Sequence, residues 1–356
     1  MKIYAFHLLN DYSGSPKVLM QLVKGWTKSG IDVTVVTCSG REGFLSHLDQ
    51  VHYVEYWYRW AANPFLRLIN LTLSQVIVVA RLVTVIKKND IVYINTVLPF
   101  GAAFLGMLKG CRIIYHIHET SMKPPLLKRF LFGVMKWSAS DVIYVSKYLS
   151  EQEQVKNKRT HILYNAIEDT FLMESKKSVR PDRNPQHILM VCSLKSYKGV
   201  DEFFHLALLH PALRFQLVVN ASQKDIEGYI KEKQLAPNLT IFPVQQNLHP
   251  FYKWADIVVN LSHPDKWIET FGLTIIEGMA YGLPAIVPPA GGITEIVTDG
   301  ENGYWADPRD LQFLSDRLRK LCTPEVYFPM RKKAAERMNT YREKLLMNQS
   351  FAILNS

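Results

Sequence analysis

Segments rich in β-branched and aromatic residues alternate with segments of helical periodicity along both halves of this 356-residue chain. In the first half the pattern predicts strands at Lys2–His7, Asp32–Thr37, Ile91–Asn95, Arg112–His116 and Val142–Val145, and helices at Pro16–Ser29, Phe65–Lys87 and Leu126–Trp137. In the second half it predicts strands at His187–Cys192, Phe215–Val219, Thr240–Phe242, Ile257–Asn260 and Ala285–Pro288. Because strands that are separated by helices form parallel sheets, we expect the α/β class.

A polar segment that contains two prolines, Glu174–Pro185, separates the two series of strands. We therefore expect an N-terminal domain at 1–175, a linker at 176–186 and a C-terminal domain at 187–328. The remaining residues, 329–356, are predicted to form a helical, basic segment. A chain of this length with 48% hydrophobic residues can bury two cores of ordinary size.

The cysteines and the apolar segments bear on the cellular compartment. Four cysteines are scattered without a CxxC pair, which predicts neither a zinc site nor a disulfide framework and favours the reducing cytoplasm. The apolar run at the amino terminus is too short for a signal peptide and is interpreted as a first strand. Polar residues interrupt Phe65–Ile86, so we interpret that segment as a helix of the fold and not as a membrane span.

The excess positive charge lies entirely in the first half. Residues 1–183 contain 24 Lys and Arg against 14 Asp and Glu, an excess of 10, whereas residues 184–356 contain 18 of each. Lys123–Trp137 reads as a basic amphipathic helix, and Tyr56–Trp60 supplies aromatic side chains suited to a membrane interface. We expect peripheral contact with an anionic membrane surface, with internal packing of these segments as the alternative. Nucleic acid is a weaker interpretation, because no Gly-aromatic strand motif or basic repeat accompanies the charge.

Two carboxylates, Glu269 and Glu277, flank a predicted helix start in the stretch His263–Asn302. The helix should begin near Thr270–Gly272, and its free N–H groups would form a site for a diphosphate. A ribose diol could donate hydrogen bonds to Glu277, and a hexose beyond the diphosphate could donate to Glu269. By spacing alone, an exposed glutamate and an ion-paired one remain the alternative.

The surrounding residues carry a more specific signal. ETFGLTIIEGMAYGLPAIVPPAGGITEIV resembles the signature of the retaining glycosyltransferases of family 4, in which a Glu, seven residues and a second Glu hold the donor sugar and the nucleotide ribose. Further similar segments follow the family's order along the chain: SGSPK at Ser13–Lys17, His118 and Glu119, SASDVIYVSKYLSEQ at Ser138–Gln152, ILYNAIED at Ile162–Asp169, LKSYKGVDEFFHLA at Leu194–Ala207, and FYKWADIVVNLS at Phe251–Ser262. The resemblance implies the GT-B architecture, with two Rossmann-like parallel-sheet domains facing a cleft and a last helix that crosses back to the first domain.

The resemblance also implies roles for individual residues. Lys198 stands where the family binds the donor diphosphate, and His118 where it has a histidine facing the donor sugar; His118, Glu269 and Lys198 are the expected catalytic residues. The family commonly has an arginine where this chain has Ser193, and whether Lys195 replaces it stays open. The expected donor-binding residues are Gly14, Lys195, Lys198, Glu269, Thr270, Phe271, Gly272, Leu273 and Glu277.

No metal ion and no cofactor are expected. The chain contains no Asp-x-Asp sequence, so a metal-bound diphosphate has no support. A helix dipole, a lysine and backbone amides would take the place of the cation.

The resemblance implies an enzyme that moves a hexose from a nucleotide-diphosphate sugar, UDP-linked in preference to GDP-linked, with retention of configuration. The expected acceptor is lipid-linked or a glycan at the cytoplasmic membrane face, in surface polysaccharide or glycolipid synthesis. Alternatives are a nucleotide-sugar epimerase of the same architecture and a catalytically degenerate sugar-nucleotide-binding protein, which Ser193 and Asn220–Ser222 would suit. A dinucleotide dehydrogenase is poorly supported because GxGxxG is absent after the first strand.

Overall fold

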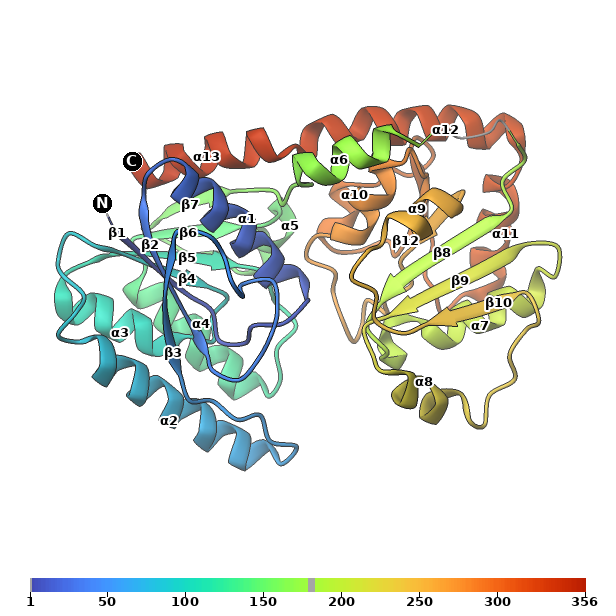
Figure 1. Cartoon of the computed structure of the whole chain (residues 1–356). Coiled ribbons are helices and arrows are strands. Elements are labelled where there is room, and N and C mark those ends of the chain that lie inside the picture. Colours follow the sequence, from blue (N-terminus) through green and yellow to red (C-terminus); the bar gives the residue numbers. More distant parts are fainter. Residues whose placement is uncertain (1, 179–182) are drawn as a thin grey trace. The chain divides into compact units, whose positions relative to one another are not determined.

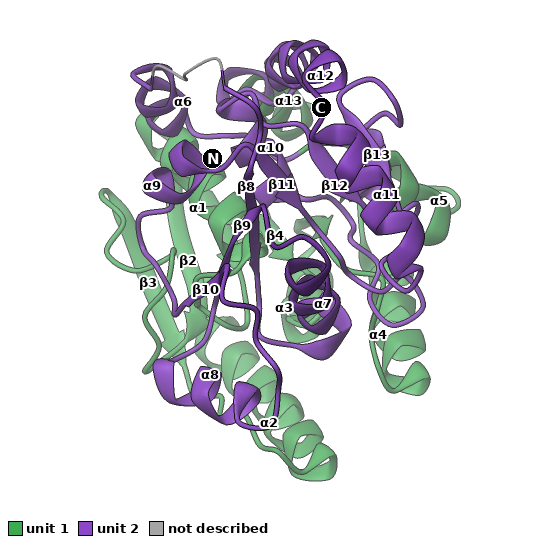
Figure 2. Cartoon of the chain, turned by 90° about the vertical axis from the view of Figure 1, so that its right-hand side faces the viewer, with its two compact units in different colours: residues 1–164, 346–356 green, residues 165–345 purple. Residues whose placement is uncertain are grey.

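The computed structural model describes residues 2–178 and 183–356, which divide into two compact units (Figure 2). The first unit contains the chain up to Tyr164 together with Leu346–Ser356, and the second contains Asn165–Leu345. Each unit is built around one parallel sheet with helices beside it, so the predicted α/β class with two parallel-sheet domains is confirmed.

The sheet of the first unit has seven strands in the order β3-β2-β1-β4-β5-β6-β7, and every neighbouring pair is parallel (Figure 1). Its strands are β1 (Lys2–Phe6), β2 (Asp32–Cys38), β3 (Val51–Tyr56), β4 (Ile91–Asn95), β5 (Arg112–Ile117), β6 (Asp141–Tyr144) and β7 (Arg159–Ile162). Its helices are α1 (Gly14–Lys28), α2 (Pro64–Leu82), α3 (Phe100–Lys109), α4 (Pro125–Ser138), α5 (Lys147–Gln152) and most of α13 (Glu343–Asn355). Because the chain order reverses between β1 and β4, loops that leave these neighbouring strands diverge at this point of the sheet.

The sheet of the second unit has six parallel strands in the order β10-β9-β8-β11-β12-β13. Its strands are β8 (His187–Cys192), β9 (Arg214–Val219), β10 (Leu239–Phe242), β11 (Ile257–Val259), β12 (Ala285–Val287) and β13 (Gly303–Trp305). Its helices are α6 (Asp169–Lys176), α7 (Val200–Leu209), α8 (Gln223–Ile230), α9 (His249–Trp254), α10 (Leu273–Ala280), α11 (Leu311–Leu321) and α12 (Pro324–Arg337), with short 3-10 turns η1 (Ser196–Lys198), η2 (Gly292–Glu295) and η3 (Met338–Tyr341). Here the chain order reverses between β8 and β11.

The boundaries of the units differ from the expected domain boundaries. The first unit ends at Tyr164 and not at 175, because the following residues pack within the second unit: the Ile167 amide donates to the Tyr341 carbonyl at 2.9 Å, and the Phe171 ring stacks on His249 at 4.2 Å. Of the expected linker at 176–186, residues 179–182 lie outside the described residues. Of the expected C-terminal segment at 329–356, residues up to Leu345 belong to the second unit and the remainder to the first.

A buried carboxylate on β6 joins the neighbouring strands β5 and β7 of the first unit and, through Arg112, the end of α13. Asp141 is fully buried, and it accepts hydrogen bonds at 2.8 Å from both Arg112 and Arg159, and its second oxygen lies 3.0 Å from Nε2 of His161. The Arg112 guanidinium also donates to the last carbonyls of α13, those of Ile353 and Leu354, at 2.7 Å. Burial alone would raise the pKa of Asp141, but hydrogen bonds and the charges of the two arginines outweigh it and hold the pKa below its ordinary value.

We expect Asp141→Asn to destabilise the protein by roughly 2 to 4 kcal/mol, because it removes the charge of a buried carboxylate that two arginines bind. In the wild type this contribution is present above the unfolded pKa of about 3.9 and is lost as the pH falls through the lower folded pKa. Urea unfolding at pH 7 and pH 3, followed by circular dichroism, measures both effects. Asp316→Asn, which removes one partner of an exposed ion pair with Arg319, is the matched control and should cost less than about 0.5 kcal/mol. Equal losses in the two variants would contradict the role of Asp141.

Candidate active site

Glycines shape the start of α10, the helix that the sequence places between the two glutamates. Gly272 precedes the helix with a φ of +137°, and a Cβ there would lie 2.9 Å from Cγ1 of Ile293. Both observations require glycine, and the predicted helix start is correct. Within the helix Ile276 is buried, whereas Leu273 and Ala280 are partly exposed.

Glu269 lies in the loop between β11 and α10 and is held by side chains on two sides. Its Oε1 forms an ion pair with the Lys198 ammonium and accepts a hydrogen bond from Ser262 Oγ at 2.7 Å. Burial would raise the pKa of Glu269, but the Lys198 charge and the hydrogen bonds from Lys198, Ser262 and Asn260 together outweigh burial and lower the pKa below its ordinary value. The carboxylate is therefore ionised at neutral pH. Its backbone is fixed too, because a Cβ on Gly291 would lie 2.4 Å from the Glu269 carbonyl oxygen.

Lys198 ends the 3-10 turn η1, directly before α7. The next residue, Gly199, has a φ of +77°, and a Cβ there would lie 2.1 Å from the carbonyl oxygen of Leu261. Only glycine therefore allows this turn to pack against the loop that follows β11. The Lys198 ammonium lies 4.7 Å from the centroid of the Trp267 ring, which stacks on Tyr197 at 5.6 Å with an angle of 19° between the rings. The ammonium is thus placed by an anion on one side and an aromatic face on the other.

Two further contacts join the β8 loop to the β11 loop, and sequence reasoning missed both. The His263 amide donates to the Tyr197 carbonyl at 2.8 Å, and the His263 ring nitrogen Nε2 lies 2.8 Å from Oε1 of Glu202, which is in the first turn of α7. β8 and β11 are the neighbouring strands between which the chain order reverses, and ligands of open parallel sheets bind at such points. The structure therefore brings Lys198 and Glu269 together at the expected place in this fold.

Glu277 is buried inside α10 and has a partner that the sequence did not reveal. Tyr252 Oη donates to Oε2 of Glu277 at 2.7 Å, and the fully buried Tyr252 ring stacks on Tyr281 at 6.0 Å. The Tyr281 hydroxyl in turn lies 2.6 Å from Nδ1 of His249. Residues of α9 and of the end of α10 thus hold the carboxylate in one orientation.

The other expected donor-binding residues of the second unit are placed differently from one another. Thr270 and Leu273 are partly exposed beside Gly272, whereas Phe271 is buried and packs edge-on against Tyr341 at 5.6 Å. Phe271 therefore supports the loop from behind. Lys195 is exposed at the start of η1, and the structure does not bring it into the ion pair of Lys198 with Glu269.

In the first unit, Asn95 connects the expected glycine loop to His118. Asn95 is the last residue of β4; its Oδ1 accepts a hydrogen bond from His118 Nε2 at 2.8 Å, and its side-chain nitrogen donates to the Ser15 carbonyl at 3.1 Å. Ser15 follows Gly14, the first residue of α1. The same amide nitrogen lies 3.0 Å from Nδ1 of His7. A single asparagine at the end of a strand gave no sequence signal, so Asn95 was missed.

Burial sets the protonation of this histidine group. Burial lowers the pKa of His118 well below the ordinary value, and electrostatic repulsion between a protonated His118 and the neighbouring His116 and His7 rings lowers it further. Burial also lowers the pKa of His7 to about 4 and that of His116 to about 3. All three rings are neutral at pH 7, and His118 can act there as a hydrogen-bonding group but not as a cation.

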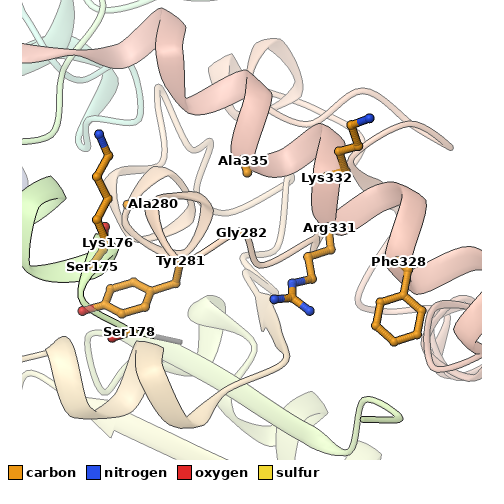
Figure 3. A pocket seen from close by; sticks show the side chains of 10 residues that line it. All are labelled: Ser175, Lys176, Ser178, Ala280, Tyr281, Gly282, Phe328, Arg331, Lys332 and Ala335. Carbon is orange, nitrogen blue, oxygen red and sulfur yellow. The ribbon is translucent and has the colours of Figure 1, made fainter. Parts of the chain in front are cut away.

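A separate basic cavity of about 410 Å³ lies at the other end of α10 (Figure 3). Its walls come from the ends of α6 and α10 and from α12, and they include Lys176, Tyr281, Arg331 and Lys332. Because this cavity meets the carboxyl end of α10, it does not coincide with the site at Gly272. Within residues 2–178 and 183–356, no group of three or more His, Cys, Asp and Glu side chains is arranged to hold a metal ion.

Comparison with known proteins agrees with the division into two units. Residues 12–171 match the family model "Glycosyltransferase Family 4", and residues 173–344 match the model "Glycosyl transferases group 1". An uncharacterized glycosyltransferase of Methanocaldococcus jannaschii is 26% identical over 265 residues, which cover 72% of this chain and 71% of that protein.

Solved structures share the whole fold at low sequence identity. Anabaena HepE, determined in complex with UDP and glucose, superposes with a TM-score of 0.79 at 18% identity over the full length of both chains. The lipopolysaccharide outer core galactosyltransferase WaaB, in its apo form, gives a TM-score of 0.73 at 18% identity and covers all of this chain and 99% of its own. Two family models that follow one another along nearly the whole sequence, together with this shared fold, show that the chain belongs to the GT-B glycosyltransferases that combine a family 4 domain with a group 1 domain.

Proposed function

We propose that this glycosyltransferase moves a hexose from a UDP-sugar to a lipid-linked or glycan acceptor with retention of configuration. The observation that carries the proposal is the position of two carboxylates on either side of Gly272, where α10 begins. Glu269, before the helix, is paired with Lys198, and Glu277, inside the helix, accepts a hydrogen bond from Tyr252. GDP is the alternative base. Surface polysaccharide or glycolipid synthesis at the cytoplasmic face of the membrane is the proposed setting.

Each group has a part in this proposal. The ribose diol donates to Glu277, whose carboxylate Tyr252 keeps oriented, and the hexose hydroxyls donate to Glu269. The diphosphate meets the first amides of α10 and the Lys198 ammonium, which also stabilise the charge that develops as the nucleoside diphosphate departs. A phosphate oxygen of the leaving group takes the proton of the acceptor hydroxyl, and no metal ion is needed.

The proposed donor and acceptor draw support from relatives. HepE was determined with UDP and glucose, which favours UDP as the base, and WaaB is named for transfer to a lipopolysaccharide, which favours an acceptor of that chemical kind. A thermal-shift screen of UDP-, GDP- and ADP-sugars tests the donor, since a ligand at about 100 times its Kd adds roughly 2.7 kcal/mol of stability. Product analysis with and without acceptor separates transfer from epimerisation and from binding without turnover.

We expect Lys198→Ala to lower turnover by about two orders of magnitude, because the same cation faces the bound diphosphate and the departing one. Lys195→Ala, three residues earlier and exposed, is the matched control and should cost less than tenfold. Steady-state kinetics on both variants measure the difference. A wild-type rate in Lys198→Ala with unchanged donor affinity would place Lys198 outside the site, whereas an equally large loss in Lys195→Ala would assign Lys195 the role of the family's arginine.

Activity should persist in a metal chelator. The positive groups of the proposed diphosphate site are an ammonium and backbone amides, neither of which EDTA removes. Transfer measured in EDTA and in added magnesium should agree within about twofold, which corresponds to only ~0.4 kcal/mol. Loss of activity in EDTA that magnesium restores would overturn the metal-independent mechanism.

The two glutamates should fail differently. Glu277→Gln loses the charge-assisted hydrogen bonds to the ribose, so calorimetry should show UDP binding weakened by roughly 1 to 3 kcal/mol. Glu269→Gln should leave UDP affinity unchanged or raise it, since UDP carries no hexose and the variant frees Lys198 from its carboxylate partner. Transfer should fall in both. Equal losses of UDP affinity in the two variants would refute the division of roles.

Tyr252→Phe tests whether the hydrogen bond from Tyr252 orients the Glu277 carboxylate. It keeps the ring that stacks on Tyr281 and removes only the hydroxyl that donates to the carboxylate. We expect a smaller loss of UDP affinity than in Glu277→Gln, about 0.5 to 1.5 kcal/mol. No loss at all would show that the carboxylate is oriented without Tyr252.

A further inference from the structure

Helix α2 exposes a row of apolar side chains, although two of its polar side chains are buried. Leu66, Ile69, Leu73 and Val76 follow one another at helical spacing, and each is between 45% and 59% exposed; Phe65 and Leu68 beside them are 69% and 45% exposed. The opposite face is buried and contains the polar Ser74 and Gln75 together with three apolar residues, Leu71, Val78 and Leu82. A helix that is apolar on both faces presents an apolar surface outward, and an exposed apolar surface of this size marks an interaction site.

The buried face of α2 is fastened to the first unit. The Gln75 side-chain oxygen accepts from the Gly101 amide of α3 at 3.0 Å, and a Cβ on Gly101 would lie 2.8 Å from the Gln75 carbonyl oxygen. Arg81 donates to the Glu55 carbonyl of β3. Although α2 is the one described helix that is long and apolar enough to cross a membrane, these contacts hold it along the outside of α3 (Figure 1).

Two neighbouring helices extend this apolar surface. Phe104 and Leu108 of α3 are 40% and 70% exposed, and Leu126, Phe130 and Trp137 of α4 are 79%, 47% and 67% exposed. Ring contacts connect the helices, since Phe104 lies 6.4 Å from Trp137 and Phe100 lies 5.4 Å from Phe130. We call the exposed apolar side chains of α2, α3 and α4 together the α2–α4 face.

An aromatic loop adjoins α2. Trp60 is 51% exposed and lies 5.7 Å from the Arg67 guanidinium, and the Arg59 carbonyl accepts from the Asn70 side chain at 2.7 Å. The expected aromatic segment is thus divided, because Tyr56 is buried in β3 while Trp60 lies beside α2. Tryptophan next to arginine is typical of side chains at the level of lipid headgroups.

The charges on these helices all have one sign. α2, α3 and α4 contain no Asp or Glu, and their basic residues are Arg67, Arg81, Lys109, Lys128, Arg129 and Lys136. Lys128 pairs with Glu153 at 2.6 Å and is only partly exposed, so it belongs to the fold and not to the free basic surface. Arg129 and Lys136 are exposed. Two copies of this face brought together would repel each other, whereas an anionic surface complements it.

We propose that the α2–α4 face lies on an anionic lipid bilayer, with α2 parallel to the membrane plane. Its apolar side chains enter the boundary between headgroups and acyl chains, and the surrounding arginines and lysines meet the anionic headgroups. The α2–α4 face would be the surface that binds the membrane at which the proposed function takes place, so this inference rests on the proposed function. The principal apolar contact comes from α2, which the sequence analysis interpreted as a helix of the fold.

Co-sedimentation with vesicles tests the proposal without donor or acceptor. The wild type should bind vesicles that contain 30% phosphatidylglycerol at least tenfold more tightly than pure phosphatidylcholine vesicles. The triple variant Leu66→Gln, Ile69→Gln, Leu73→Gln should lose at least tenfold of this affinity, and Arg129→Glu, Lys136→Glu should lose the preference for anionic lipid. Glutamine keeps the helix propensity of α2, and circular dichroism checks that the variants are folded.

The matched control replaces three apolar residues of similar exposure in the second unit, Met173→Gln, Leu209→Gln and Val244→Gln, and should bind like the wild type. The α2 variant should still bind the UDP-sugar, so a failure of the donor site and a failure of the membrane face are separately visible. Unchanged vesicle binding by the α2 variant overturns the proposal. So does a wild-type dimer that the α2 variant converts to a monomer, and so does wild-type protein that resists extraction from vesicles at high pH, as a spanning helix would.

Discussion

The ion pair between Lys198 and Glu269 is the interaction around which the second unit's site is arranged. It joins the loop that follows β8 to the loop that follows β11, and these strands are neighbours in the sheet but far apart in sequence. A charge pair with side chains only 13% and 16% exposed is stable when further groups surround it, and Ser262 and Trp267 do so here. The pair keeps a cation and an anion at fixed places, so a substitution of either residue changes the electrostatics of the other.

The backbone around this pair is as constrained as the side chains. Gly199 and Gly291 each lie directly against the backbone of another loop. A Cβ on Gly199 would lie 2.1 Å from the Leu261 carbonyl oxygen, and a Cβ on Gly291 would lie 2.4 Å from the Glu269 carbonyl oxygen. These contacts leave no room for a larger residue, and they explain why glycine recurs on both sides of the site. The rigidity suits a site that holds groups ready for charge as it develops, since little reorganisation is then required.

The sequence predicted the parts of the fold that have a local cause. The central strands, the start of α10 and the two glutamates follow from apolar runs and glycine positions within short segments. The edge strands β3 and β7 were missed because exposed residues interrupt their apolar pattern. Tyr252, Asn95 and the contact of His263 with Glu202 were missed because each partner comes from a different part of the chain. The interpretation of α2 as a helix of the fold agrees with the structure, but the sequence did not reveal that Ser74 and Gln75 are buried while a row of its apolar residues is exposed.

The chain enters the second unit once, after Tyr164, and leaves it once, after Leu345. The second unit is therefore an uninterrupted stretch of sequence, whereas the first unit is discontinuous. During synthesis, Trp26 and Arg112 leave the ribosome long before Ser350 and the last carbonyls of α13, to which they bond. The first half must wait in an incomplete state while about 180 residues are made, which at roughly 5 to 20 residues per second takes on the order of ten seconds or more. Translation speed through the second unit thus sets how long the apolar α2 is carried on an unfinished domain.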